Sequence, residues 1–189
     1  MNKPQIGIAM TGSFCTLTAV LDALRPLAER YELFPIMSSI TYETNTRFGT
    51  AAHFRERLEG LCGKEIWHTI PQVEPIGPKN LLDALMVAPC TANTLAKLAM
   101  GIADTAVTMA AKSTLRNHKP ILLAISTNDA LSSAAKNIGA LQAARNYYFV
   151  PYGQDDPLAK PRSCIADFSK IPAALEAALQ GAQLQPILL

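Results

Sequence analysis

Small residues with hydroxyl or amide groups gather in two short stretches of the chain, Thr11-Gly12-Ser13-Phe14 and Pro89-Cys90-Thr91-Ala92-Asn93-Thr94. Each stretch follows an apolar run and leads into a segment with helical periodicity. Backbone N–H groups at the start of a helix, together with hydroxyl groups, are suited to binding an anion. The two stretches therefore predict an anion site, and a phosphate is the ligand that fits them most simply.

An ordinary structural role explains part of the same pattern. Ser13 and Asn93 are residue types that cap helix N-termini, and Gly12 is of a type common in turns. Spacing alone does not separate these roles from ligand binding, so both interpretations stay open on the sequence.

The motifs that the chain lacks narrow the kind of ligand. The stretch Gly7–Ser13 has neither the G-x-G-x-x-G pattern nor a Walker loop, which argues against hydrolysis of ATP or GTP. A dinucleotide fold usually places an acidic residue after its second strand, whereas this chain has Met37-Ser38-Ser39. Ser38 and Ser39 suit a single phosphate or a polar ring edge better than an adenosine ribose.

The cysteines do not indicate a metal site. Cys15, Cys62, Cys90 and Cys164 are widely spaced, and no C-x-x-C pair or Cys/His cluster has the spacing of a zinc or iron–sulfur centre. The sequence predicts no metal and four reduced thiols, as in a cytoplasmic protein.

Apolar runs that alternate with helical segments must position the two stretches, and they predict an α/β fold built on a mainly parallel sheet. We expect strands at Gln5–Met10, Leu33–Ser38, Glu65–His68, Leu85–Ala88, Pro120–Ser126 and Tyr147–Val150. We expect helices at Cys15–Arg30, Ala51–Leu61, Asn93–Gly101, Asp104–Arg116, Ala130–Arg145 and Ile171–Gly181. Pro35 cannot donate to a ladder, so its strand is expected to be irregular. Three long connections, 39–50, 69–80 and 151–162, are of a length typical of functional or disordered loops.

In a three-layer, doubly wound, Rossmann-like sheet, ligands bind beyond the carboxyl ends of the strands where the strand order reverses. The loops after the first and fourth predicted strands are the two polar stretches at Gly12 and at Thr91, so we expect them to lie side by side at that point.

Size and charge set further limits. A chain of 189 residues with 49% apolar content is expected to form one domain spanning residues 1–189. A net charge of +2, with scattered lysines and arginines, gives no footprint for nucleic acid. The segment Ile6–Met10 is too short for a signal-peptide core and no run approaches a membrane span, so neither secretion nor membrane insertion is predicted.

The segment Ala88–Lys97, followed by Gly101-Ile102-Ala103-Asp104, resembles the flavoprotein family that includes the FMN-dependent cysteine decarboxylases. That family carries a Pro-Ala-Ser/Thr-Ala-Asn-Thr type of loop and then a Gly-x-Ala-Asp segment. The resemblance implies FMN as cofactor. It places the cofactor at Thr11, Gly12, Ser13, Phe14, Ser38, Ser39, Pro89, Cys90, Thr91, Ala92, Asn93, Thr94 and Ser126.

Five further stretches resemble one member of this family, which belongs to a two-component synthase that makes a pyridine dicarboxylate in spore-forming bacteria. They are Thr46–Gly49, Glu74–Lys79, Thr108–Lys112, Ala124–Asp129 and Tyr148–Asp155. The resemblance implies a separate A subunit, on which NAD(P) is a further candidate cofactor, a small dicarboxylate substrate, a homo-oligomer and the cytoplasm of the mother cell. Making the aromatic ring is a two-electron oxidation, which a flavin or nicotinamide can perform and side chains cannot. Two alternatives stay open: an FMN-dependent decarboxylase, and a scaffold without catalysis that activates its partner.

Resemblance also suggests candidates for catalysis and substrate binding. His68 falls near the place of the decarboxylase histidine, although a lone histidine there could simply cap a strand. Arg47, Lys79 and Lys112, with Arg162, could pair with substrate carboxylates, although each alone is more often a solvated charge. Cys90 could touch a flavin or substrate, but a buried, inert thiol is the simpler interpretation. Cys164 has only Arg162 nearby to lower its pKa, so we predict no reactive role for it.

Overall fold

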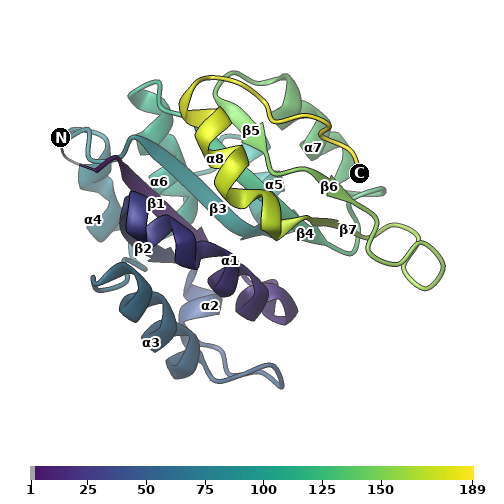
Figure 1. Cartoon of the computed structure of the whole chain (residues 1–189), viewed down its shortest axis with the longest axis horizontal. Helices are drawn as coiled ribbons and strands as arrows, with labels where there is room; N and C mark the ends of the chain where they lie inside the picture. The colour runs from purple at the N-terminus through teal and green to yellow at the C-terminus, as the bar shows by residue number, and fades with distance from the viewer. Residues whose placement is uncertain (1–2) are drawn as a thin grey trace.

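The computed structural model describes residues 3–189, which form a twisted sheet with helices on both faces (Figure 1). The strands are β1 (Gln5–Met10), β2 (Glu32–Met37), β3 (Ala84–Cys90), β4 (Ile121–Thr127), β5 (Tyr147–Phe149), β6 (Tyr152–Gly153) and β7 (Cys164–Ala166). Strands β1 to β5 pair in parallel, with β2, β1, β3 and β4 as successive neighbours. Beyond them, β7 pairs antiparallel with the end of β4, and β6 pairs antiparallel with β7. The predicted α/β, mainly parallel architecture is confirmed.

Helices cover the two faces of the sheet. The helices are α1 (Leu17–Arg30), α2 (Ser39–Glu43), α3 (Ala51–Cys62), α4 (Ile70–Val73), α5 (Ala92–Ala99), α6 (Ala106–Arg116), α7 (Ala135–Ala143) and α8 (Ile171–Leu179), with 3-10 turns at Phe14–Thr16, Glu74–Ile76 and Phe168–Lys170. In Figure 1, α1 and α8 lie in front of the sheet, while α5 and α6 lie behind it. Within residues 3–189, no helix has the length and apolar character needed to cross a membrane.

The core forms because the central strands are apolar on both faces. Every residue of β3 is buried, as are all but one of the residues in β1 and in β4, the pattern of a parallel strand covered by helices on both sides. Helix α1 buries Leu17, Val20, Leu21, Leu24 and Leu27 at helical spacing. Each fully buried aliphatic side chain of this kind stabilises the fold by about 1.5–3 kcal/mol.

The predicted strand at Glu65–His68 is wrong. The structure has a single bridge there, between Ile36 and Trp67. Trp67 N–H donates to the Pro35 carbonyl at 2.9 Å, so Pro35 turns its backbone toward the outer edge of β2. Because proline has no N–H, it cannot donate to a neighbouring strand at that edge, and the pairing stops after one bridge.

Because Glu65–His68 is not a strand, the later strands are numbered one lower than expected. The location of the ligand site does not change. The strand that we expected to be the fourth is β3, which lies directly beside β1. The strand order β2-β1-β3-β4 reverses between β1 and β3, and the loops after these two strands leave the same edge of the sheet. Their predicted proximity is confirmed.

The opposite edge of the sheet is tied by Asp83, and this contact makes stability depend on pH. Gln5 N–H donates to Asp83 Oδ2 at 2.9 Å and Lys119 Nζ donates to Asp83 Oδ1 at 3.1 Å. Partial burial by itself raises the pKa of the Asp83 carboxyl, but the Gln5 N–H and the Lys119 ammonium outweigh burial and hold this pKa below its usual value. A lowered pKa means that the contact stabilises the fold above the unfolded-state pKa and is lost as pH falls through the folded-state value.

We therefore expect Asp83→Asn to lower the free energy of unfolding by about 1 kcal/mol at neutral pH, an amount limited by solvent screening of this half-exposed carboxyl. The difference from wild type should shrink as pH falls below the usual pKa of aspartate, and it should vanish once Asp83 is protonated in the folded protein, where both proteins lack the charge. Urea unfolding at several pH values measures it. An unchanged difference in acid would show that the carboxylate charge is not responsible.

Candidate functional site

Thr11 fastens the two loops at the switch point to each other. Its hydroxyl donates to the Pro89 carbonyl at 2.7 Å and accepts from Thr91 N–H at 3.1 Å. The side chain is buried. Both hydrogen-bonding roles of the hydroxyl are thus used within the protein, and Thr11 fixes the loop after β3 relative to the loop after β1.

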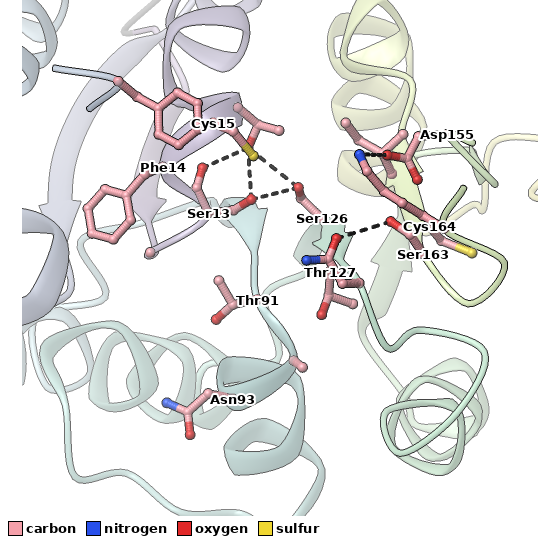
Figure 2. Close-up of a pocket in the computed structure, with 17 residues that line it drawn as sticks. Ser13, Phe14, Cys15, Thr91, Asn93, Ser126, Thr127, Asp155, Ser163 and Cys164 are labelled. Atoms are coloured by element: carbon pink, nitrogen blue, oxygen red, sulfur yellow. Dashed lines mark hydrogen bonds and ion pairs between the residues drawn. The ribbon is translucent and has the colours of Figure 1, made fainter. Parts of the chain in front are cut away.

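A cavity of about 370 Å³, which we call the Ser13 cavity, opens beside these loops (Figure 2). Loops after β1, β3 and β4 form most of its wall, and the segment between β6 and β7 closes it. Its lining is Gly12, Ser13, Phe14, Cys15, Thr16, Phe48, Thr91, Ala92, Asn93, Ser126, Thr127, Asn128, Asp155, Lys160, Ser163, Cys164 and Ile165. Cavities of roughly 300–1,000 Å³ are typical of small-molecule and cofactor sites.

A second cavity of about 390 Å³, which we call the Ser38 cavity, lies on the other side of the same loops. Its lining is Thr11, Gly12, Ser38, Ser39, Ile40, Thr91, Asn93, Thr94, Lys97, Thr105 and Val107. Gly12, Thr91 and Asn93 line both cavities and form the ridge between them. One extended ligand could therefore contact both cavities across this ridge.

The Ser38 cavity favours negative charge. The N-cap residues of α2, α5 and α6 all line it: Ser38, Thr91 and Thr105. Helix N-termini carry partial positive charge and free N–H groups. Lys97 adds a full positive charge, and its Nζ lies 2.8 Å from Asp104 Oδ1. The Lys97 ammonium lowers the pKa of the Asp104 carboxyl. This arrangement suits a phosphate group.

Three hydroxyl groups form a connected cluster in the Ser13 cavity. Ser13 Oγ lies 2.8 Å from Ser126 Oγ, and the Thr16 hydroxyl donates to the Ser13 carbonyl at 2.9 Å. These residues come from the loop after β1 and the end of β4, which the sheet brings together. The cluster can donate to or accept from a polar ligand without any charged residue.

The structure separates capping from ligand binding at the residues where the sequence left both open. Thr91, rather than Asn93, caps α5, and Ser13 makes no side-chain capping bond. Asn93 is exposed in the first turn of α5, and its amide has no hydrogen-bond partner within residues 3–189. Ser38 does cap a helix, since its hydroxyl accepts from Thr41 N–H. The Asn93 side chain therefore remains available for a ligand, whereas the Ser13 hydroxyl would meet a ligand as part of its cluster with Ser126 and Thr16.

Other predicted cofactor residues lie at different depths around the ridge. Phe14, Ala92 and Ser126 line the Ser13 cavity, while Ser39 and Thr94 line the Ser38 cavity. Pro89 and Cys90 are buried beneath the loop and line neither cavity. Burial raises the pKa of the Cys90 thiol and also of the Cys164 thiol, so neither is a thiolate at neutral pH.

His68 and the predicted carboxylate-binding residues do not gather at either cavity. The His68 ring stacks on Tyr42, with ring centroids 3.7 Å apart, and lines neither cavity. Lys79 lies on the connection that enters β3, at the amino end of the strand. Lys112 borders a separate cavity of about 180 Å³. Arg47 is exposed, with its guanidinium 4.8 Å from the ring centroid of Phe48, and Phe48 in turn lines the Ser13 cavity.

Sequence reasoning missed the charged residues of the Ser13 cavity. Lys160 and Asp155 lie on the connection 151–162, whose length and prolines indicated a functional loop without indicating which side chains it presents. Phe48 and Asn128 were missed as well. A hydrogen bond from Ser163 and the ammonium of Lys160 hold the pKa of the Asp155 carboxyl below its usual value.

Comparison with known proteins shows the family and the fold of this chain. The chain is 44% identical over 185 residues to the B subunit of dipicolinate synthase from Bacillus subtilis, covering 97% of this chain and 92% of that protein. The crystal structure of the corresponding dipicolinate synthase protein from Bacillus halodurans superposes with a TM-score of 0.90 at 39% identity, covering 100% of this chain and 98% of that one. The FMN-dependent cysteine decarboxylase SpaF shares the fold, with a TM-score of 0.69 at 21% identity over 94% of this chain and 97% of that one. The family model described as Flavoprotein matches residues 1–178, and this chain belongs to that family.

Proposed function

We propose that this chain is the FMN-binding component of a two-component dipicolinate synthase. With a separate partner protein, the A component, it would convert dihydrodipicolinate, or its hydroxytetrahydro precursor, to dipicolinate during sporulation. The observation that carries the proposal is the pair of cavities joined at one ridge, in a chain that matches the B component of dipicolinate synthase along almost its whole length.

The residues of the ridge and the two cavities fit FMN. A phosphate suits the Ser38 cavity, where three helices begin and Lys97 lies close by. Ser13, Asn93 and Ser126 offer hydrogen bonds to the polar edges of a flavin. When bound, FMN supplies an acceptor for the two electrons that leave a dihydropyridine as it becomes aromatic. NAD(P) on the A component is the other carrier that this reaction would accommodate.

In this proposal the side chains of the protein hold and orient the cofactor and the substrate. The hydroxyl cluster and the first turn of α5 fix the ligand against the ridge, and Phe48 covers one side of the Ser13 cavity. A preorganised polar wall lowers the cost of ordering substrate and cofactor. The small dicarboxylate substrate would occupy the part of the Ser13 cavity that is bordered by Asn128 and Lys160.

We further propose that the chain acts as one flavoprotein-like domain, assembles with copies of itself, and works in the cytoplasm of the mother cell. The single family match over residues 1–178 supports one domain, and the similarity to a dipicolinate synthase subunit of Bacillus subtilis supports a role in sporulation. Exposed apolar side chains at Met100 and Ile102, beside the end of α5, offer surface for contacts between protomers.

The geometry gives less support to an FMN-dependent decarboxylase. That reaction would require a proton-transferring histidine at the site. His68 stacks against Tyr42 and lines neither cavity. A scaffold role without catalysis has no observation of its own in its favour.

Titration of the purified chain into FMN tests the flavin part of the proposal. We expect quenching of flavin fluorescence and a yellow protein after gel filtration. Ser13→Ala combined with Ser126→Ala should weaken FMN binding by roughly tenfold, because two hydrogen-bonding groups are lost. The two hydroxyls bond to each other, so removing both avoids leaving one of them unpaired. Thr16 keeps its hydrogen bond to the Ser13 carbonyl.

Ser169→Ala is the matched control, since Ser169 is exposed and lies outside both cavities. It should bind FMN like the wild type. A wild-type protein that neither quenches the fluorescence nor retains the colour would rule out FMN as its cofactor.

A further inference from the structure

The charge of the Ser13 cavity is concentrated in one ion pair. Among the side chains of residues 3–189 that line it, Lys160 is the one lysine or arginine and Asp155 the one acid. Lys160 Nζ lies 3.1 Å from Asp155 Oδ2. In Figure 2, Asp155 lies on the far side of the cavity from Ser13. The remaining lining residues are neutral, so an anion that enters from this side meets a single full positive charge.

The backbone around Lys160 is held in place, although its side chain is free to move. Lys160 N–H donates to the Asp156 carbonyl at 2.7 Å, and the Lys160 carbonyl accepts from Ser163 N–H at 3.0 Å. Gln154 Nε2 closes the same turn by donating to the Pro161 carbonyl at 2.9 Å. The Lys160 side chain itself is 54% exposed. A fixed backbone with a solvated ammonium can change partners without refolding the turn.

The Asp155 contact is weak enough to be exchanged. Exposed ion pairs of this kind contribute little to stability because water and salt screen them. Asp155 also raises the pKa of Lys160, so the ammonium stays charged at neutral pH. Only a quarter of the Asp155 side chain is exposed, whereas the Lys160 side chain is 54% exposed, so Lys160 is the partner that can turn toward a ligand.

We propose that Lys160 anchors one carboxylate of the pyridine dicarboxylate, exchanging its contact with Asp155 for the ligand. The assignment rests on the proposed function and adds to it the residue that recognises the substrate. The ammonium donates to the ligand carboxylate, which is a charge-assisted hydrogen bond. Asn128 borders the same part of the cavity, and its amide N–H groups can donate to the second carboxylate of the ligand. Lys160 is thus a positioning and specificity residue with no step of proton or electron transfer.

Calorimetric titration of dipicolinate into the full-length chain, with FMN present, tests this assignment. We expect Lys160→Gln to weaken dipicolinate binding by roughly tenfold or more, while FMN binding stays unchanged. Lys136→Gln is the control, because Lys136 is exposed on α7 and lines neither cavity. The wild type should prefer dipicolinate to pyridine-2-carboxylate, and this preference should collapse in Lys160→Gln.

The variant Asp155→Asn tests whether Lys160 binds the ligand or only forms a structural ion pair with Asp155. If Lys160 exchanges partners, Asp155→Asn frees the ammonium and should bind dipicolinate at least as tightly as the wild type, up to roughly threefold more tightly. Equal weakening in Asp155→Asn and Lys160→Gln would overturn the proposal, as would an unchanged affinity in Lys160→Gln. A wild type that binds FMN but not dipicolinate would also overturn it and leave the flavin assignment standing. Dipicolinate binding that depends on Lys160, in a chain that does not bind FMN, would support the anchor and refute the flavin.

Discussion

Replacing Ala92 with phenylalanine is expected to weaken FMN binding by roughly hundredfold and to leave the fold intact. Ala92 is the first residue of α5, and its methyl group lines the Ser13 cavity next to the ridge. A phenyl ring at this position would extend into the space that the ligand must fill. Forcing a ligand against such a group typically costs about 1–3 kcal/mol or more, so we expect affinity to fall by roughly hundredfold.

The measurement is again quenching of flavin fluorescence, with circular dichroism and thermal unfolding to verify the fold. Ala135→Phe is the matched control, since Ala135 is the first residue of α7 and is exposed outside both cavities. It should bind FMN normally. If Ala92→Phe bound FMN as tightly as the wild type, the cofactor could not lie where we place it.

Sequence reasoning located the ligand loops because their position follows from general rules. Strand β1 was predicted with its observed bounds, Gln5–Met10, since its apolar run is continuous and ends at turn residues. Parallel strands release their loops at one edge, so the loops at Gly12 and at Thr91 had to meet wherever the strand order reverses. Neither inference required knowledge of a long-range contact between particular side chains.

Prediction failed where a contact depends on one residue at an edge. The segment Glu65–His68 has the composition of a short strand, but Pro35 leaves only one bridge for it to make. The predicted start of α7 was also too early, because residues 128–134 form turns in which Ser132 N–H donates to the Asp129 carbonyl at 3.0 Å. Apolar periodicity contains no information about such local competition.

The sequence patterns did not predict the charged residues of the Ser13 cavity. Lys160 and Asp155 reach the Ser13 cavity because β7 turns back antiparallel against the end of β4. A βαβ pattern predicts parallel neighbours only, and strands as short as β6 and β7 give almost no periodic signal. Scattered basic residues such as Lys79 and Lys112 were therefore selected by charge alone, and the structure places them away from the cavity.

Synthesis of dipicolinate by the purified components tests the central claim most directly. The A component, this chain, or both together would be supplied with dihydrodipicolinate, FMN and NAD(P)+, and dipicolinate would be measured by its ultraviolet absorbance after chromatography. We predict rapid formation with the pair, loss of it when this chain is omitted, and strong impairment with Ala92→Phe in place of the wild type. Formation by the A component without this chain, at the rate of the complete pair, would contradict the account.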